Sequence, residues 1–153
     1  MNTLNHLATG TIIALLIDKP LIAVPLAFLS HFALDAVPHF GFNAGSESGY
    51  AEALEHKWLS TPPLVLDIFG TGILVWLIRG QPWYVFAAAV AAIVPDLKWP
   101  YRYFKFERKG IKPPKPDAIT QFHLKIQWAE RPWGLVIEIP YALAALFMVS
   151  RLT

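Results

Sequence analysis

The stretch SHFALDAVPHF, residues 30–40, decides the expected fold, because it places His31, Asp35 and His39 four residues apart at the end of an apolar run that begins at residue 21. A four-residue step turns an α-helix by only about 40° beyond a full turn and advances it by about 6 Å, so the three side chains share one stripe. An ionisable side chain at the middle of a bilayer costs about 2.5 to 3.5 kcal/mol on insertion scales. We therefore expect the three side chains of the stripe to have a function. Two imidazoles with a carboxylate are suited to binding a metal ion.

The composition favours an all-α integral membrane protein. Of the 153 residues, 55% are hydrophobic and only 16% are charged, and the mean hydropathy is +0.42, which is more apolar than a typical soluble domain. Apolar runs lie at residues 4–17, 21–37, 64–78, 83–94 and 133–149. They predict a bundle of about five membrane-embedded helices, forming one domain over residues 1–153. Residues 41–60 and 98–131 are predicted to be loops outside the membrane with short interfacial helices.

The basic residues predict the orientation of this bundle. With the N-terminus inside, five alternating spans put most of the Lys and Arg residues on the cytosolic side, as the positive-inside rule requires. These are Lys57, Lys98, Arg102, Lys105, Arg108, Lys109, Lys112, Lys115, Lys125 and Arg131, while Lys19, Arg79 and Arg151 fall outside. The first residues lack the basic region and cleavage site of a signal peptide, so we expect them to be retained as structure.

The expected partners follow from the same charges. A net charge of +2 without a basic helix face does not favour nucleic-acid binding. The segment at 98–117 interleaves aromatic with basic residues, which is typical of a loop resting among lipid headgroups. A folded cytosolic loop is the alternative. We therefore expect membrane lipids as partners and no nucleic acid.

Further polar residues are predicted to reach the cytosolic half of the bundle from other helices. His6 opens the first apolar run, Asp96 follows Pro95 at the end of the fourth, and Asp67 and Glu138 lie early in the third and fifth runs. The predicted metal ligands are His6, His31, Asp35, His39 and Asp96. Asp67 and Glu138 are the predicted catalytic carboxylates, able to take a proton from water. The chain has no Cys, and this ligand set favours zinc, with manganese or iron as other possibilities.

Ordinary bonding within the fold is the alternative for several of these residues. His31 and Asp35 could form a hydrogen-bonded core pair, and His39 could cap its helix. His6 could be a solvated residue near the N-terminus, and Asp67 could form a hydrogen bond in its protonated state. Asp96 could pair with Lys98, and Glu138 could bond Tyr141 as a neutral carboxyl. His123 and Gln127 are again four apart and could close over the site, but a histidine beside Lys125 is more often a surface residue, which is the interpretation we favour for His123.

Three short motifs resemble the membrane-bound metal-dependent hydrolase family of bacteria and archaea, which is distantly linked to zinc-dependent phospholipase C. They are NHLATG near the start, SHFALD in the second apolar run and IVPD in the fourth. The family is similar in carrying an early His, a Leu-Pro-Asp element and a Ser-His-x-x-x-Asp element in membrane helices. The resemblance implies that His6, His31, Asp35 and Asp96 bind metal.

The leading hypothesis is therefore a membrane-embedded metal-dependent hydrolase acting on phosphoester or lipid-type substrates at the cytosolic headgroup level. A cation or proton carrier or channel built on the same His and Asp cluster is the first alternative. The outer halves of the helices offer few polar groups for such a route. A non-catalytic membrane protein held together by a metal is the second alternative.

Overall fold

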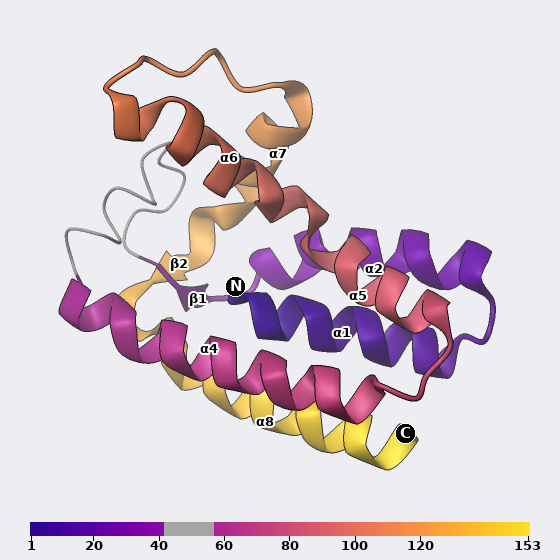
Figure 1. Cartoon of the computed structure of the whole chain (residues 1–153). Helices are drawn as coiled ribbons and strands as arrows, with labels where there is room; N and C mark the ends of the chain where they lie inside the picture. The colour runs from indigo at the N-terminus through magenta and orange to yellow at the C-terminus, as the bar shows by residue number, and fades with distance from the viewer. Residues whose placement is uncertain (42–56) are drawn as a thin grey trace.

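The computed structural model describes residues 1–41 and 57–153, and the described chain is mostly helical, which confirms the all-α expectation. The described residues form longer and shorter helices, whose arrangement can be followed in Figure 1. The longer helices are α1 (Thr3–Leu16), α2 (Pro20–Asp35), α4 (Lys57–Ile78), α5 (Trp83–Ile93) and α8 (Leu135–Leu152), and the short ones are α6 (Lys98–Lys105) and α7 (Ala118–Ile126). Each predicted apolar run thus lies within or largely overlaps one of the longer helices.

Local signals fix where the helices begin and end. The Asn2 side chain accepts a hydrogen bond from the Asn5 amide and caps α1, and Asp117 caps α7 in the same way through Thr120. Such caps satisfy amides that have no partner within the helix. Pro95 lacks an N–H, and the end of α5 accordingly tightens into a 3₁₀ turn, η1 (Val94–Leu97).

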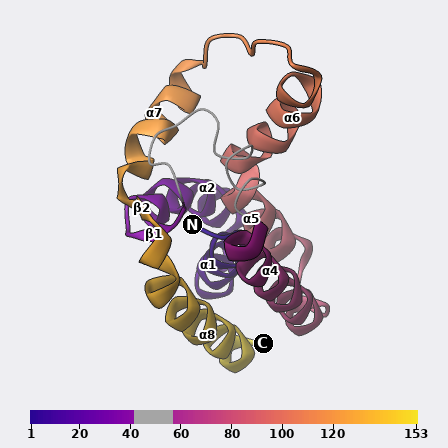
Figure 2. The ribbon, with the colours of Figure 1, turned by 90° about the vertical axis from the view of Figure 1, so that its left-hand side faces the viewer.

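The helix α1 is the central element of the bundle. It contacts α2, α5, α4 and α8, and Figure 2 shows these helices arranged around it. The short helices α6 and α7 project from one end of the bundle (Figure 1). We call residues 98–126, which include both short helices and the segment between them, the lobe. The lobe overlaps the loop predicted at 98–131, whereas most of the loop predicted at 41–60 lies outside the described residues.

Small residues fill the interior of the bundle. Alanines account for much of the buried core, which includes Ala8, Ala14, Ala23, Ala27, Ala88, Ala89, Ala92 and Ala145. At Gly10 a Cβ would lie 2.5 Å from the carbonyl oxygen of Ala88, so α1 and α5 approach as closely as their backbones allow. Close contacts through Gly and Ala are typical of helices that pack within a membrane.

Large apolar side chains lie on the outside of the same bundle. Leu21 is 92% exposed, Phe69 70% and Val136 74%, and Ile68, Phe69, Ile73 and Trp76 surround a shallow apolar groove on α4. Contiguous apolar surface of this kind marks contact with a membrane or a partner protein.

Within the described residues, one helix is long and apolar enough to cross a membrane by length and composition, the 21-residue segment Pro132–Leu152. Thr3–Leu16, Pro20–Asp35 and Pro62–Ile78 are apolar but shorter. The described helices therefore support one candidate span by this criterion, rather than the five that the sequence predicts.

A short parallel strand pair closes the end of the bundle from which the lobe projects. His39 and Phe40 form β1 (His39–Phe40), which pairs with β2 (Glu130–Arg131). The turn η4 (Pro132–Gly134) follows β2. A Cβ at Gly134 would lie 2.0 Å from the carbonyl carbon of His39, so glycine is required for this approach.

Candidate metal centre

Four side chains from separate parts of the chain meet at the lobe end of the bundle. His31 and Asp35 come from α2, Asp96 from η1 and His123 from α7. One possible ligand atom from each lies within 4.8 Å of the other three, and the group could hold a metal ion. We call these four residues the metal group.

The distances between the ligand atoms are short. His123 Nε2 lies 2.6 Å from Asp35 Oδ2 and 3.0 Å from His31 Nε2, while His31 Nε2 lies 3.2 Å from Asp35 Oδ2. Asp96 Oδ1 is farther, at 3.6 Å from His31 Nε2 and 3.7 Å from His123 Nε2. Ligand atoms around a tetrahedral zinc ion, at bond lengths of about 2.0 to 2.1 Å, lie about 3.3 Å apart. The observed distances scatter around that value.

A backbone contact fixes the proton on His31. Its Nδ1 lies 2.8 Å from the carbonyl oxygen of Ala92, near the tightened end of α5. A carbonyl only accepts hydrogen bonds, so Nδ1 carries the proton and, in the neutral ring, Nε2 points a lone pair at Asp35. Two acceptors at 3.2 Å repel unless a positive charge lies between them, either a proton or a metal ion. Fixing of the remote nitrogen by a carbonyl is also how metal-binding histidines are usually oriented.

His6 lies directly beside the metal group. Its ring stacks on that of His31, with centroids 4.1 Å apart and planes 23° apart. His6 Nε2 lies 3.1 Å from Asp35 Oδ1 and 4.0 Å from Asp96 Oδ2. The side chain is fully buried, yet within the described chain neither ring nitrogen makes a hydrogen bond. Burial of a polar group without a hydrogen bond is costly, and a cation bound by both His6 and the neighbouring carboxylates would remove that cost.

The position of His123 corrects the sequence interpretation. We expected a surface histidine, but the side chain is 2% exposed and belongs to the metal group. The Gln127 amide lies 3.3 Å from His123 Nε2, so the predicted proximity of these two residues is present. Nothing in the local sequence signals the contact with α2, because His123 and Asp35 are 88 positions apart.

Lys98 holds α7 over the metal group. Its Nζ donates to both carboxylate oxygens of Asp117, at 2.8 and 3.0 Å, and to Thr120 Oγ1 at 3.1 Å. The hydrogen bonds from Lys98 and Thr120 keep the pKa of Asp117 below its usual range. The sequence offered a pair between Lys98 and Asp96, but the lysine binds Asp117 instead. This contact joins the segment of Asp96 to the helix that carries His123.

The predicted catalytic carboxylates bind the N-terminal segment that leads to His6. Asp67 Oδ1 accepts from the Leu4 amide at 2.6 Å, and Glu138 Oε1 accepts from the Asn2 amide at 2.9 Å. The Met1 amino group lies 2.6 Å from Asp35 Oδ1. The alternative contact between Glu138 and Tyr141 is replaced by a hydrogen bond from Tyr141 to Thr9. The catalytic roles of Asp67 and Glu138 stay predictions.

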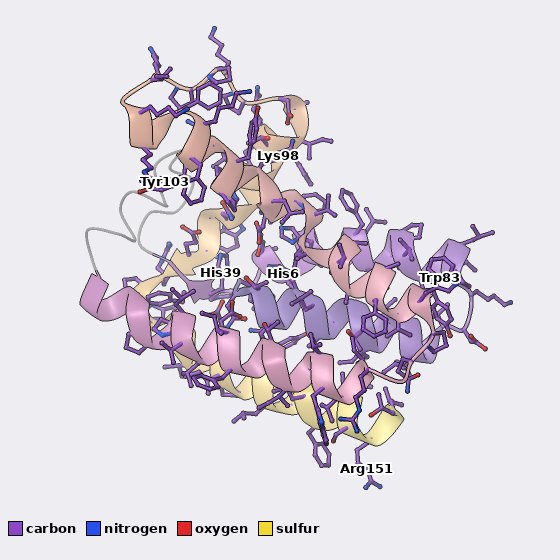
Figure 3. The ribbon with its side chains drawn as sticks, in the orientation of Figure 1. His6, His39, Trp83, Lys98, Tyr103 and Arg151 are labelled. Carbon is purple, nitrogen blue, oxygen red and sulfur yellow. The ribbon has the colours of Figure 1, made fainter. Side chains whose placement is uncertain are left out.

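His39, the remaining predicted ligand, lies in β1 outside the metal group. Its Nδ1 is 2.8 Å from the carbonyl oxygen of Val37, and its Nε2 is 3.7 Å from Glu130 Oε1. Figure 3 shows His6 and His39 toward the lobe end of the bundle, with Trp83 and Arg151 toward the other end. The structure therefore does not bring His39, which the sequence predicts as a ligand, together with the metal group.

The metal group has one accessible member. The Asp96 side chain is 30% exposed, whereas His31 and Asp35 are fully buried and His123 nearly so. Asp96 is therefore the member of the group that solvent reaches, just before the first turn of α6.

The donor set suits a divalent ion of borderline hardness, because two imidazoles and two carboxylates are ligands of zinc, manganese and iron. The facing acceptors His31 Nε2 and Asp35 Oδ2 and the His6 ring without a hydrogen bond are both consistent with a cation bound at this place. Compared with known family models, with curated proteins and with solved structures, the chain matches none of them.

Proposed function

We propose that the chain is a membrane-embedded metal-dependent hydrolase that cleaves phosphoesters at the level of the lipid headgroups on the cytosolic side. The observation that carries the proposal is the meeting of His31, Asp35, Asp96 and His123, with one ligand atom from each within 4.8 Å of the others. Three of the four are buried, and burying such groups is costly unless they are paired or bind a metal.

Zinc is the proposed ion, because two imidazoles and two carboxylates match its ligand preferences and all four ligand atoms lie within 4.8 Å of one another. A bound divalent ion supplies a Lewis acid that polarises a phosphoryl oxygen and makes water a better nucleophile at neutral pH. Ala92 orients His31 through Nδ1, and Lys98 holds α7 so that His123 stays in place. Asp67 and Glu138 are proposed to accept the proton from water.

The charge of the lobe supports an anionic substrate. Exposed basic residues on and between its helices are Lys105, Arg108, Lys109, Lys112, Lys115 and Lys125. Asp96, the partly exposed member of the metal group, is two residues before the lobe begins. Phosphate groups would therefore be attracted to the lobe and to the neighbouring end of the metal group.

The distribution of side chains supports the membrane location. The apolar part of the interior is rich in Ala, the exterior carries large apolar residues, and Pro132–Leu152 is long enough to span. Shorter apolar helices such as α1 and α2 can be accommodated by tilting or by thinning of the bilayer. The proposed orientation, with the N-terminus and the site on the cytosolic side, rests on the positive-inside rule.

The test is hydrolysis by the detergent-purified protein loaded with zinc, using a chromogenic phosphodiester and anionic phospholipid vesicles. We expect metal-dependent turnover that is lost in Asp35→Asn and kept in Asp18→Asn, an exposed aspartate just beyond the far end of α1. Turnover that survives in Asp35→Asn, or an absence of turnover in wild type that carries zinc, would contradict the proposal.

Burial also supports a second candidate, a metal that holds the helices together without catalysis. His31, Asp35 and His123 tie α2 to α7 and are almost inaccessible, as ligands in structural sites usually are. In that case, removing the metal would lower the thermal stability sharply, and the loaded protein would hydrolyse none of the phosphoesters.

A further inference from the structure

We propose that the site holds two metal ions bridged by Asp35 and Asp96, with His31 and His123 binding one ion and His6 binding the other. The inference rests on the proposed metal centre and adds a second ion that the four-residue metal group does not contain. Its basis is the way in which each carboxylate divides its two oxygens between two sets of imidazoles.

Asp35 presents different oxygens to the two sides. Its Oδ2 faces His123 Nε2 at 2.6 Å and His31 Nε2 at 3.2 Å, whereas its Oδ1 faces His6 Nε2 at 3.1 Å. A carboxylate that serves one ion through both oxygens would turn both toward the same imidazoles. The division observed here is that of a bridging carboxylate.

Asp96 repeats the division at longer range. Its Oδ1 is the oxygen near His31 and His123, at 3.6 and 3.7 Å, and its Oδ2 is the one near His6, at 4.0 Å. Asp35 and Asp96 thus each direct one oxygen toward His31 and His123 and the other oxygen toward His6. Each side then has two oxygens and at least one imidazole nitrogen.

The stacked rings set the separation of the ions. His6 and His31 lie with their centroids 4.1 Å apart and nearly parallel, and their Nε2 atoms face opposite oxygens of Asp35. Ions bound by these two nitrogens would be separated by a similar distance. Two-metal sites that activate water and hold a phosphoryl group have their ions about 3.5 to 4 Å apart.

The state of His6 is an independent observation. Its side chain is fully buried, and within the described residues neither of its ring nitrogens makes a hydrogen bond, although Nε2 is 3.1 Å from a carboxylate oxygen. The contact between His6 Nε2 and Asp35 Oδ1 therefore lacks the angle of a hydrogen bond. A metal ion lying between His6 Nε2 and Asp35 Oδ1 would bind both atoms. The Met1 amino group, 2.6 Å from the same Asp35 oxygen, would then leave it or bind the second ion as an amine.

A dinuclear centre narrows the class of substrate. Paired ions at this separation clamp the attacking and the leaving oxygen of a phosphoryl group during in-line displacement. The substrate class that fits the site is therefore a phosphate mono- or diester with its phosphate directed past Asp96.

The experiment is the metal content of detergent-purified protein, by elemental mass spectrometry after loading with zinc and removal of the excess. We expect two ions per chain in wild type and in Asp18→Asn, and one in His6→Gln, whose amide roughly preserves the volume of the ring. Circular dichroism shows whether His6→Gln is folded. Wild type loaded with Mn²⁺ provides a test without a variant, because two adjacent ions give a spin-coupled electron paramagnetic resonance spectrum.

The outcomes separate this inference from the proposed function. One ion in wild type with an uncoupled Mn²⁺ spectrum would overturn the second site and leave the mononuclear hydrolase intact. Two ions in both wild type and folded His6→Gln would place the second ion elsewhere and overturn the role of His6. Wild type that binds none after loading would overturn both.

Discussion

Lys98 and Asp117 form an ion pair, with Nζ 2.8 Å from one carboxylate oxygen and 3.0 Å from the other. The pair joins two segments that are distant in the sequence. Lys98 is two residues after Asp96, and Asp117 caps the helix that carries His123. The pair therefore joins the start of α6 to the start of α7 within the lobe, close to the point where Asp96 and His123 converge.

Replacing this lysine should weaken metal binding without removing a ligand. In Lys98→Met, α7 loses the ion pair that joins it to the segment of Asp96. The pair is solvent-exposed, and such pairs contribute about 0 to 1 kcal/mol, so we expect the zinc affinity to fall by about two- to fivefold. Competition with a chromogenic chelator measures the change. Lys112→Met, at an exposed position of the same lobe, should leave the affinity unchanged, and equal effects of the two substitutions would show that only the charge of the lobe matters.

The proposed bases can be separated from the ligands. Asp67→Asn and Glu138→Gln should keep the zinc content of wild type and lower the turnover number by about 10² to 10⁴-fold, the usual contribution of general base catalysis. Steady-state kinetics on metal-loaded protein measures this. If either variant loses its metal, or both retain full turnover, the assigned proton transfer is wrong and the contacts to Leu4 and Asn2 account for the residue.

The close approach of α1 and α5 is a test of the fold. Gly10→Ala would place a Cβ 2.5 Å from the carbonyl oxygen of Ala88, so we expect the bundle to be destabilised by about 1 to 3 kcal/mol. Gly72→Ala is the matched control, because nothing lies within 4 Å of its Cβ position and alanine favours the helix. Thermal unfolding in detergent should show a lower midpoint for Gly10→Ala and not for Gly72→Ala.

The membrane location can be tested on the outer face of α8. Leu143 is 64% exposed, and Leu143→Lys should reduce insertion by about 2.5 to 3.5 kcal/mol if the residue faces lipid near the bilayer centre. Glycosylation mapping of insertion measures the effect. Ile119→Lys makes the same change at an exposed lobe residue and should insert like wild type. A chain that is recovered from the aqueous fraction with or without Leu143→Lys would contradict the proposed location.

Local patterns predicted the part of the site that lies on one helix. His31 and Asp35 are four residues apart on α2 and meet in the metal group, as their spacing indicates. Pro95 marked the end of α5 and the position of Asp96. The approximate positions of the longer helices followed from the apolar runs, because that signal is local, but α4 begins at Lys57, within the loop predicted at 41–60.

The rest of the site depends on contacts between distant segments. His123 reaches His31 across 92 positions, and its neighbours in the sequence resemble a surface helix. His39 follows Pro38, where α2 has already ended, so it enters β1 and departs from the stripe. Asp67 and Glu138 bind backbone amides of the N-terminal segment, and hydrophobic periodicity contains no information about such partners.

The most direct test of the metal centre compares the zinc affinity of His123→Gln with that of His39→Gln. His123 lies in the metal group, and His39 lies outside it in β1. The geometry predicts that zinc affinity, measured by chelator competition in detergent, falls strongly in His123→Gln and stays at the wild-type level in His39→Gln. Unchanged affinity in a folded His123→Gln protein, or an equal loss in both variants, would contradict it.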